Sequence, residues 1–153
     1  MSVSLYHFPP SAPSRGALLV AKVLGVDIDV QYIDLFKKEQ LKPDFVNFPI
    51  LFLDEIEVSE DKKTSLDEAL GFLDIFLDGQ DFVAGDKLTV ADCACVASVS
   101  SIVAVGWDVS PYRNVAAWIT RCARAIPDYA QANQDGADRF GKAVRSKMAP
   151  GQI

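Results

Sequence analysis

The hydrophobic pattern is densest between residues 90 and 105, where nearly every side chain is apolar or small. A helix that is apolar on all its faces is a buried helix, and a run of about sixteen residues is too short to span a bilayer. Just before this run, Thr89 and Asp92 have the spacing of a capping box, in which each side chain binds a backbone N–H of the other residue. Gly85 is expected to supply a positive φ in the preceding loop. We therefore expect the helix Val90–Val105 to lie at the centre of the core.

The start of the chain combines two strand patterns with one helix pattern. Apolar and polar residues alternate in Val3–Phe8 and again in Ile28–Leu35, which is typical of short strands. Between them, apolar residues recur at helical spacing in Ser14–Leu24, with Pro13 suited to the first turn and Gly25 to the end of the helix. Strand, helix and strand in this order form a βαβ unit, whose two strands should be parallel.

Helical patterns fill most of the remaining chain. One helix should begin after Ser59, another should span Tyr112–Ala125, and a last helical region should cover Pro127–Met148, with breaks near Gly136 and Gly141. The expected buried stripe of the first comprises Leu66, Ala69, Leu70, Leu73, Phe76 and Leu77, and that of the second comprises Val115, Trp118, Ile119 and Cys122. The last hundred residues are thus expected to be helical.

Composition narrows the function classes. The chain has 153 residues, of which 50% are hydrophobic, and a net charge of -6. This acidic balance argues against nucleic acid or an anionic membrane as a partner. Cys93 and Cys95 point to different sides of a helix and cannot pair, metal-ligand spacing is absent, and no metal is expected. His7 has no catalytic partner at a suitable spacing and is expected to be a strand residue. We see no signal peptide at the N-terminus and expect a cytoplasmic protein.

Several segments resemble the insect delta- and epsilon-class glutathione transferases. They are Tyr6–Arg15, Ala21–Gly25, Leu41–Phe45, Leu66–Leu73, Phe82–Asp92 and Asn114–Trp118. The run Gly85–Asp92 is the most specific of them. The resemblance implies an α+β, mostly helical fold, in which residues 1–47 form a partial thioredoxin-like N-terminal domain and residues 48–153 form an all-helical C-terminal domain.

The resemblance also implies that an internal block is missing. In the family, the segment that matches Leu41–Phe45 is followed by a stretch with a cis-proline, two strands, a Glu-Ser motif and two long helices. Here the chain passes directly to Phe48–Leu53. This segment resembles the end of the family's fourth helix, although its pattern alone would equally allow a third strand. An exon-skipped isoform, a diverged gene or an imperfect gene model would each give such a sequence.

Ser11 is the catalytic candidate that the resemblance implies. The matching serine in the family donates a hydrogen bond to the sulfur of bound glutathione and favours the thiolate. The position just before a helix N-terminus suits this role, because the helix dipole favours negative charge there. From the sequence alone, a turn or cap residue is the favoured interpretation of Ser11. Arg15 is a weaker candidate for binding glutathione, with a structural role on the first helix as the alternative.

The resemblance further implies an apolar site for a second substrate. The matching side chains are Pro10, Ala12, Phe48, Phe52, Phe140 and Val144, with plain core packing as the alternative. Glutathione would be the co-substrate, and small apolar electrophiles would be the partners. The family's other glutathione contacts lie mostly in the missing block, so we expect weak conjugation.

Two function classes follow for this sequence. The first is a glutathione transferase that conjugates small electrophiles in detoxification. The second is a non-catalytic relative that binds apolar ligands or protein partners through its helical domain. The family forms homodimers, largely through the third and fourth helices. Because this chain mostly lacks those helices, we expect a monomer or a heterogeneous oligomer, with apolar patches at Phe48, Ile50 and Phe52.

Overall fold

A computed structural model describes residues 3–37, 39 and 59–148. The predictions for residues 48, 50 and 52 therefore lie outside the described residues. The chain begins with strand β1 (Val3–His7), helix α1 (Ala12–Leu24) and strand β2 (Ile28–Tyr32). The two strands pair in parallel, with Val3 opposite Ile28 and His7 opposite Tyr32. The predicted βαβ unit is confirmed, with strands that end slightly earlier than the alternating pattern does.

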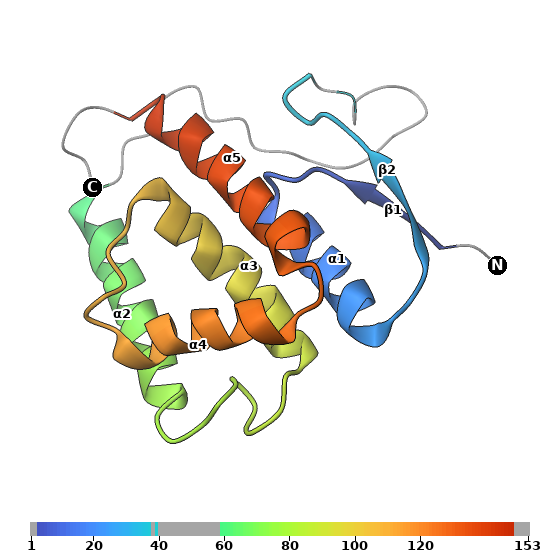
Figure 1. Cartoon of the computed structure of the whole chain (residues 1–153). Helices are drawn as coiled ribbons and strands as arrows, with labels where there is room; N and C mark the ends of the chain where they lie inside the picture. The colour runs from blue at the N-terminus through green and yellow to red at the C-terminus, as the bar shows by residue number, and fades with distance from the viewer. Residues whose placement is uncertain (1–2, 38, 40–58, 149–153) are drawn as a thin grey trace.

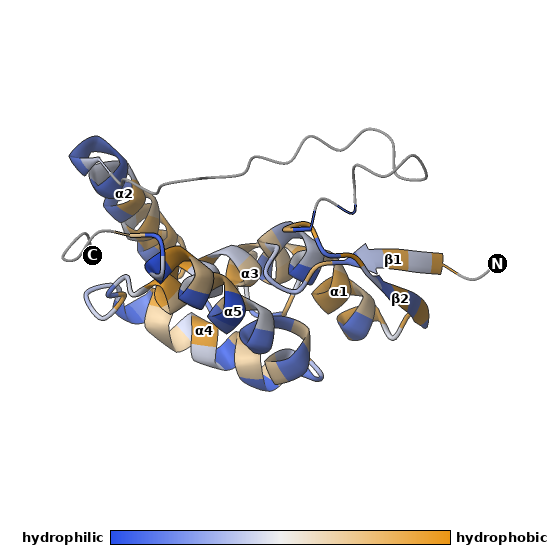
Figure 2. Cartoon of the chain, turned by 90° about the horizontal axis from the view of Figure 1, so that it is seen from above, coloured by the Kyte–Doolittle hydropathy of each residue, from blue (hydrophilic) through white to orange (hydrophobic). Residues whose placement is uncertain are grey.

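Helices make up the rest of the described chain. They are α2 (Glu60–Phe76), α3 (Val90–Val105), α4 (Arg113–Ala125), the π-helix η3 (Ala130–Gln134) and α5 (Asp135–Arg145). Helix α3 contacts α1, α4 and α5. The views in Figures 1 and 2 place α2 at one end of the molecule and the two-stranded sheet at the other, with α3 between them.

The core is built around α3, as predicted. Its residues Cys93, Val96 and Ala97 are fully buried together with Trp118 of α4, at the centre of one hydrophobic cluster. However, α3 is not covered on every face by described residues, since Val90 is 60% exposed. Ala94 and Ser98, which follow Val90 at intervals of four, are also exposed.

The end of the chain differs from the sequence prediction. Gly136 and Gly141 do not break the helix, because α5 is continuous from Asp135 to Arg145. Both glycines are buried at close helix contacts instead: a Cβ on Gly136 would clash with the carbonyl of Pro9, and a Cβ on Gly141 would clash with that of Ala104. The absence of a side chain therefore lets α5 approach the β1–α1 loop and α3 closely.

Helix α2 buries a narrower stripe than predicted. Leu70 and Leu77 are buried, but Ala69 and Phe76 are exposed. The reason is that α2 packs mainly on α4, where the Asp74 carboxylate accepts the backbone N–H groups of Asn114 and Val115 at the start of that helix. One-sided packing leaves the opposite face of α2 in solvent.

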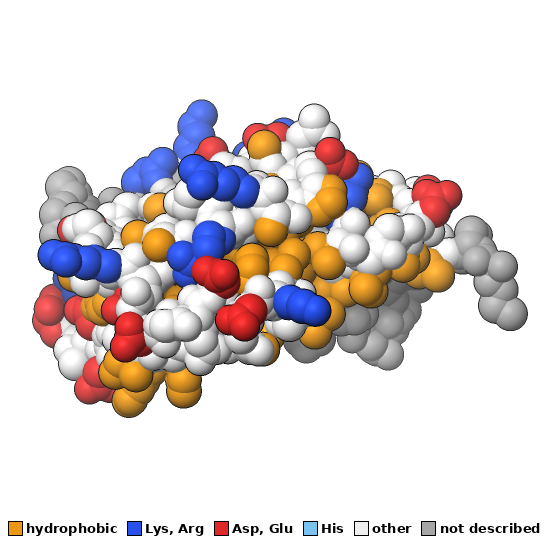
Figure 3. All heavy atoms as spheres, turned by 60° about the horizontal axis from the view of Figure 1, so that its bottom comes forward, with side chains coloured by type: hydrophobic (Ala, Val, Ile, Leu, Met, Phe, Trp, Pro, Cys, Tyr) orange, Lys and Arg blue, Asp and Glu red, His pale blue; other side chains and the backbone are white. Residues whose placement is uncertain are grey.

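Hydrophobic side chains reach the surface in several places. On α2, Phe72 is 63%, Ile75 70% and Phe76 63% exposed. On the sheet, the exposed hydrophobic residues are Val3, Tyr6, Val30 and Tyr32. Figure 3 shows such side chains gathered on one face of the molecule. In the part of the chain described here, no helix is long and apolar enough to cross a membrane.

Candidate functional site

The β1–α1 loop holds Ser11 at the N-terminus of α1. Its backbone is extended, with φ -78° and ψ 115°, and its Oγ accepts the N–H of Ser14 at 3.4 Å. Its own N–H donates to the carbonyl of Phe8 at 2.9 Å. Ser11 therefore caps helix α1, which was the alternative role considered for this residue. Capping uses the oxygen as an acceptor and leaves the hydroxyl proton for another partner.

The Ser11 hydroxyl is suited to bind an anion. No described residue accepts its proton, and the side chain is half-buried. The N-terminal end of α1 adds a favourable dipole. A hydrogen bond from the Ser11 hydroxyl to a sulfur atom beside it would favour the thiolate form of that sulfur.

Ser14 holds the start of the β1–α1 loop through a hydrogen bond, and His7 lies beside it. Ser14 Oγ accepts the N–H of Phe8 at 3.2 Å and lies 2.7 Å from Nδ1 of His7. Burial, with a smaller contribution from the Arg15 cation, lowers the pKa of His7. The imidazole is therefore neutral at physiological pH and occupied by Ser14, in agreement with its expected place on a strand.

Arg15 is fully buried and faces inward. Its Nη1 donates to the carbonyl of Pro9 at 2.9 Å, and its Nε donates to Oδ1 of Asn133 at 2.9 Å. Its Nη2 donates to the carbonyl of Ala97 at 2.7 Å and to the hydroxyl of Ser101. Burial lowers the pKa of Arg15 to about 10, so the side chain is still a cation at neutral pH. This placement favours the structural role over direct contact with a ligand.

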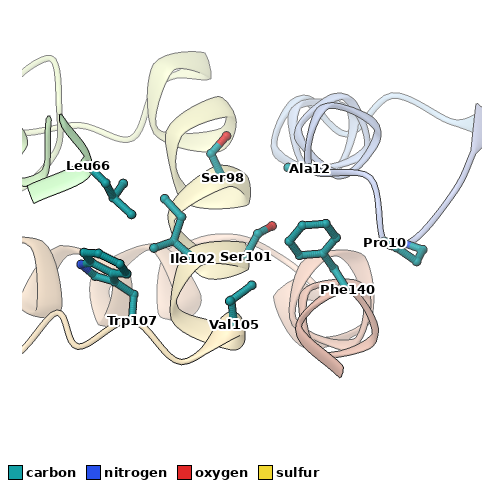
Figure 4. A pocket seen from close by; sticks show the side chains of 9 residues that line it. All are labelled: Pro10, Ala12, Leu66, Ser98, Ser101, Ile102, Val105, Trp107 and Phe140. Atoms are coloured by element: carbon teal, nitrogen blue, oxygen red, sulfur yellow. The ribbon is translucent and has the colours of Figure 1, made fainter. Parts of the chain in front are cut away.

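A cavity of about 340 Å³ opens beside the loop. It is lined by Pro10, Ala12, Leu66, Ser98, Ser101, Ile102, Val105, Trp107 and Phe140. Figure 4 shows Phe140 and Trp107 on opposite sides of Ser101, with Ala12 above the Phe140 ring and Pro10 beyond it. The two residues that flank Ser11 in the sequence are thus both wall residues of an apolar cavity.

The predicted apolar site is partly assembled in the structure. Pro10, Ala12 and Phe140 line the cavity, whereas Val144 is half-buried and does not line it. Phe48 and Phe52 lie outside the described residues.

Sequence reasoning missed the contribution of α3, Leu66 and Trp107. Ser98, Ser101, Ile102 and Val105 recur at intervals of three and four along α3, so they share one face of the helix. This spacing could have predicted a shared face, but it does not stand out in a helix whose residues are apolar or small on every face.

The cysteines are unsuited to nucleophilic chemistry at neutral pH. Burial is the main cause that raises the pKa of Cys93 and of Cys95, and it raises the pKa of Cys122 to about 12. All three are free thiols. In the described part of the chain, no group of three or more His, Cys, Asp or Glu residues could hold a metal ion.

Comparisons with known proteins agree on one family. The family described as "Glutathione S-transferase, C-terminal domain" matches residues 41–125. The structure of a delta-class glutathione transferase from Nilaparvata lugens is 32% identical in sequence and has a TM-score of 0.85. The alignment covers 94% of this chain and 99% of that one. "Glutathione S-transferase unclassified 2" from Bombyx mori is 30% identical, with a TM-score of 0.86 and coverage of 97% and 100%. "Glutathione S-transferase D7" of Anopheles gambiae is 26% identical over 217 residues, which is 97% of this chain and 99% of that protein.

The two solved transferases share the fold of this chain, a βαβ unit packed on helices, over 94% and 97% of its length. The chain belongs to the glutathione S-transferase family, an enzyme family that uses glutathione as co-substrate. It is a shortened member: the 217 aligned residues of the mosquito relative exceed the 153 residues of this chain, so the alignment passes over an internal block that this chain lacks.

Proposed function

We propose that this chain binds glutathione beside Ser11 and conjugates it to small apolar electrophiles held in the cavity, as a cytoplasmic detoxification enzyme. The observation that carries the proposal is the placement of Ser11. No described residue accepts the proton of its hydroxyl, which sits at a helix N-terminus and stands between two residues that line an apolar cavity. A nucleophile and an apolar second substrate would therefore meet at one place.

The proposed reaction needs little beyond an ionised thiol. The glutathione thiol loses its proton to solvent, and the Ser11 hydroxyl donates a hydrogen bond to the thiolate. The sulfur then attacks an electrophilic carbon, a C–S bond forms, and the leaving group departs with its electron pair. The apolar walls, with Phe140 and Trp107 among them, would hold the electrophile and exclude water.

Glutathione binding is expected to be weaker than in full-length relatives. The resemblance places most of the family's contacts with the tripeptide in the missing block. Each lost hydrogen bond removes ~0.5–1.5 kcal/mol, so several together weaken affinity by orders of magnitude. Arg15 does not offer a replacement, because its N–H groups are engaged by interior acceptors.

The first test is conjugation of a simple aromatic electrophile at high glutathione concentration. We expect a low but measurable rate that falls about tenfold in Ser11→Ala, because a pKa rise of about one unit reduces the thiolate fraction by that factor. Ser65→Ala on α2 is the matched control, since its hydroxyl is exposed and bonds only within its helix. A rate that Ser11→Ala leaves unchanged would overturn the catalytic assignment.

A second candidate function is binding of apolar ligands without catalysis. It is favoured because most of the cavity wall, including Ile102, Val105 and Trp107, belongs to the helical domain and does not depend on glutathione. The two candidate functions can be separated by measuring the binding of an apolar dye through the change in Trp107 fluorescence. If this function holds, Val105→Ala weakens dye binding while the matched variant Val103→Ala does not, and no conjugation accompanies it.

We also propose the division at residues 47 and 48 and an assembly that differs from the family's homodimer. The exposed apolar residues on α2 and on the sheet support a monomer or a heterogeneous oligomer. The net charge of -6 supports small-molecule rather than nucleic-acid or anionic-membrane partners.

A further inference from the structure

We infer that Arg15 and Asn133 are positioning residues for Ser11: Asn133, in the C-terminal part of the chain, holds Arg15, and Arg15 holds the loop that carries Ser11. The inference rests on the proposed function for its catalytic consequence. Its structural part stands alone, because it concerns the contacts of the β1–α1 loop with helices that are distant in the sequence.

Ser11 and Ser14 hold the two ends of the loop, but the two prolines between them and Phe8 limit the bonds at its middle. Pro9 and Pro10 lack backbone N–H groups, so they cannot donate to neighbouring carbonyls. The Phe8 carbonyl is bound by the N–H of Ser11, one link within the loop. The Pro9 carbonyl, two residues before Ser11, is bound by Arg15 Nη1 at 2.9 Å. The guanidinium therefore fixes the peptide that leads into Pro10 and Ser11.

The burial of Arg15 costs more free energy than the burial of an apolar side chain at the same position would. It is a fully buried cation, and no described carboxylate pairs with it. Burial of a charge requires that its hydrogen-bonding groups be satisfied. Here carbonyl, amide and hydroxyl oxygens from the loop, from α3 and from η3 satisfy them. The same contacts make Arg15 the point at which these three segments are joined.

The π-helix η3 orients the side chain of Asn133 toward Arg15. The Asn133 side chain is fully buried in η3, where the wider turn changes the direction of side chains relative to an α-helix. Its Nδ2 donates to Ser100 Oγ at 3.0 Å, which orients Oδ1 toward Arg15 Nε. Three residues later, Gly136 packs directly on the Pro9 carbonyl.

One element therefore fixes both parts of the site. This element is the continuous helical segment of η3 and α5: Phe140 of α5 lies in the cavity wall, while Asn133 of η3 holds Arg15 and thereby the loop. A displacement of this segment would move the cavity wall and the Ser11 hydroxyl together.

The test compares two replacements of Asn133. Asn133→Leu keeps the size but removes the acceptor for Arg15, and Asn133→Asp keeps an acceptor. Lys22→Met is the control for α1, since Lys22 forms only an exposed ion pair with Asp128 at 2.8 Å. If Asn133→Leu does not fold, Asn133→Ser replaces it, because a small polar side chain leaves room for water.

The first readout is amide hydrogen exchange in the protein without ligand. We expect Asn133→Leu to speed exchange at Ser11 and Ser14 at least tenfold relative to Cys122 in α4, while Asn133→Asp and Lys22→Met leave the ratio unchanged. An unchanged ratio in Asn133→Leu would overturn the inference, whether or not the protein binds glutathione.

The second readout is the pKa of the bound glutathione thiol in a double-mutant cycle with Ser11→Ala. If Asn133 acts through Ser11, Asn133→Leu raises this pKa only when Ser11 is present. An equal rise in the Ser11→Ala background would also overturn the inference. If exchange changes as expected but Ser11→Ala does not affect the thiol, the positioning role stands and the proposed catalytic function fails.

Discussion

At the scale of single residues, the Asp92 carboxylate joins the start of α3 to the loop before it and to α4. Thr89 and Asp92 form the expected capping box, and the carboxylate accepts the N–H of Thr89 at 2.8 Å. The sequence did not predict that Trp118 Nε1, 26 residues further on, also donates to this carboxylate at 2.8 Å. Nor did it predict the contact of Arg15 with Asn133, 118 residues away. Such partners depend on how helices meet, which local spacing does not encode.

The Thr89 cap gives a direct stability prediction. Thr89→Ala removes the capping hydroxyl, which also donates to the Asp92 carboxylate at 2.9 Å. We expect a loss of roughly 0.5–2 kcal/mol in the free energy of unfolding, the range for a cap residue. Urea unfolding measures it, with Thr120→Ala as the control because that hydroxyl bonds only within α4. Equal urea midpoints for wild type and Thr89→Ala would show that the cap contributes nothing.

Asp92 gives a prediction on pH. Burial alone would raise the pKa of this carboxyl, but hydrogen bonds from Val83, Trp118 and Thr89 outweigh burial and hold the pKa below its usual value. A carboxyl with a lowered pKa stabilises the folded state above its unfolded pKa, near 4, and loses this contribution as pH falls through the folded pKa. Below about pH 4, we expect the stability of Asp92→Asn to fall less steeply than that of wild type. Parallel acid-unfolding curves would contradict this.

At the scale of elements, periodicity predicted the helices better than their exposure. In the predicted stripe of α4, Val115, Trp118 and Cys122 are fully buried and Ile119 is half-buried. The predicted buried stripe of α2 was too wide. Periodicity shows which residues share a face of a helix, but not how much of that face packs against another element. The predicted breaks in the last helix were wrong for a related reason. A glycine that lowers helix propensity is tolerated where close packing requires it.

The βαβ unit should be the least protected element. Two strands do not form a stable sheet alone, so β1 and β2 depend on the packing of α1 against α3. In native-state hydrogen exchange we expect the amides that pair β1 with β2 to exchange well before those of α3. Equal protection of the two would mean that the sheet has another source of stability.

At the scale of the whole molecule, the resemblance gave the family and the shortened chain, which the comparisons confirm. The cavity could not be predicted, because its walls come from the loop, α2, α3 and α5, whose relative positions depend on packing. The structure also exposes an apolar cluster, Phe72, Ile75 and Phe76, on the free face of α2.

This cluster predicts concentration-dependent association. Contiguous apolar surface favours contact between copies, so we expect light scattering after size exclusion to show a mixture that shifts toward monomer on dilution. Replacing Phe72, Ile75 and Phe76 together by serine should leave mainly monomer. A stable dimer that the triple substitution does not affect would place the interface elsewhere.

The central claim is that Ser11 ionises glutathione in this shortened chain, and one titration tests it most directly. The measurement is the ultraviolet absorbance of the glutathione thiolate as a function of pH, with the protein in excess over the tripeptide. We predict a thiol pKa below that of free glutathione, and a return toward the free value in Ser11→Ala. A thiol that titrates on the wild-type protein as it does in water would contradict the claim.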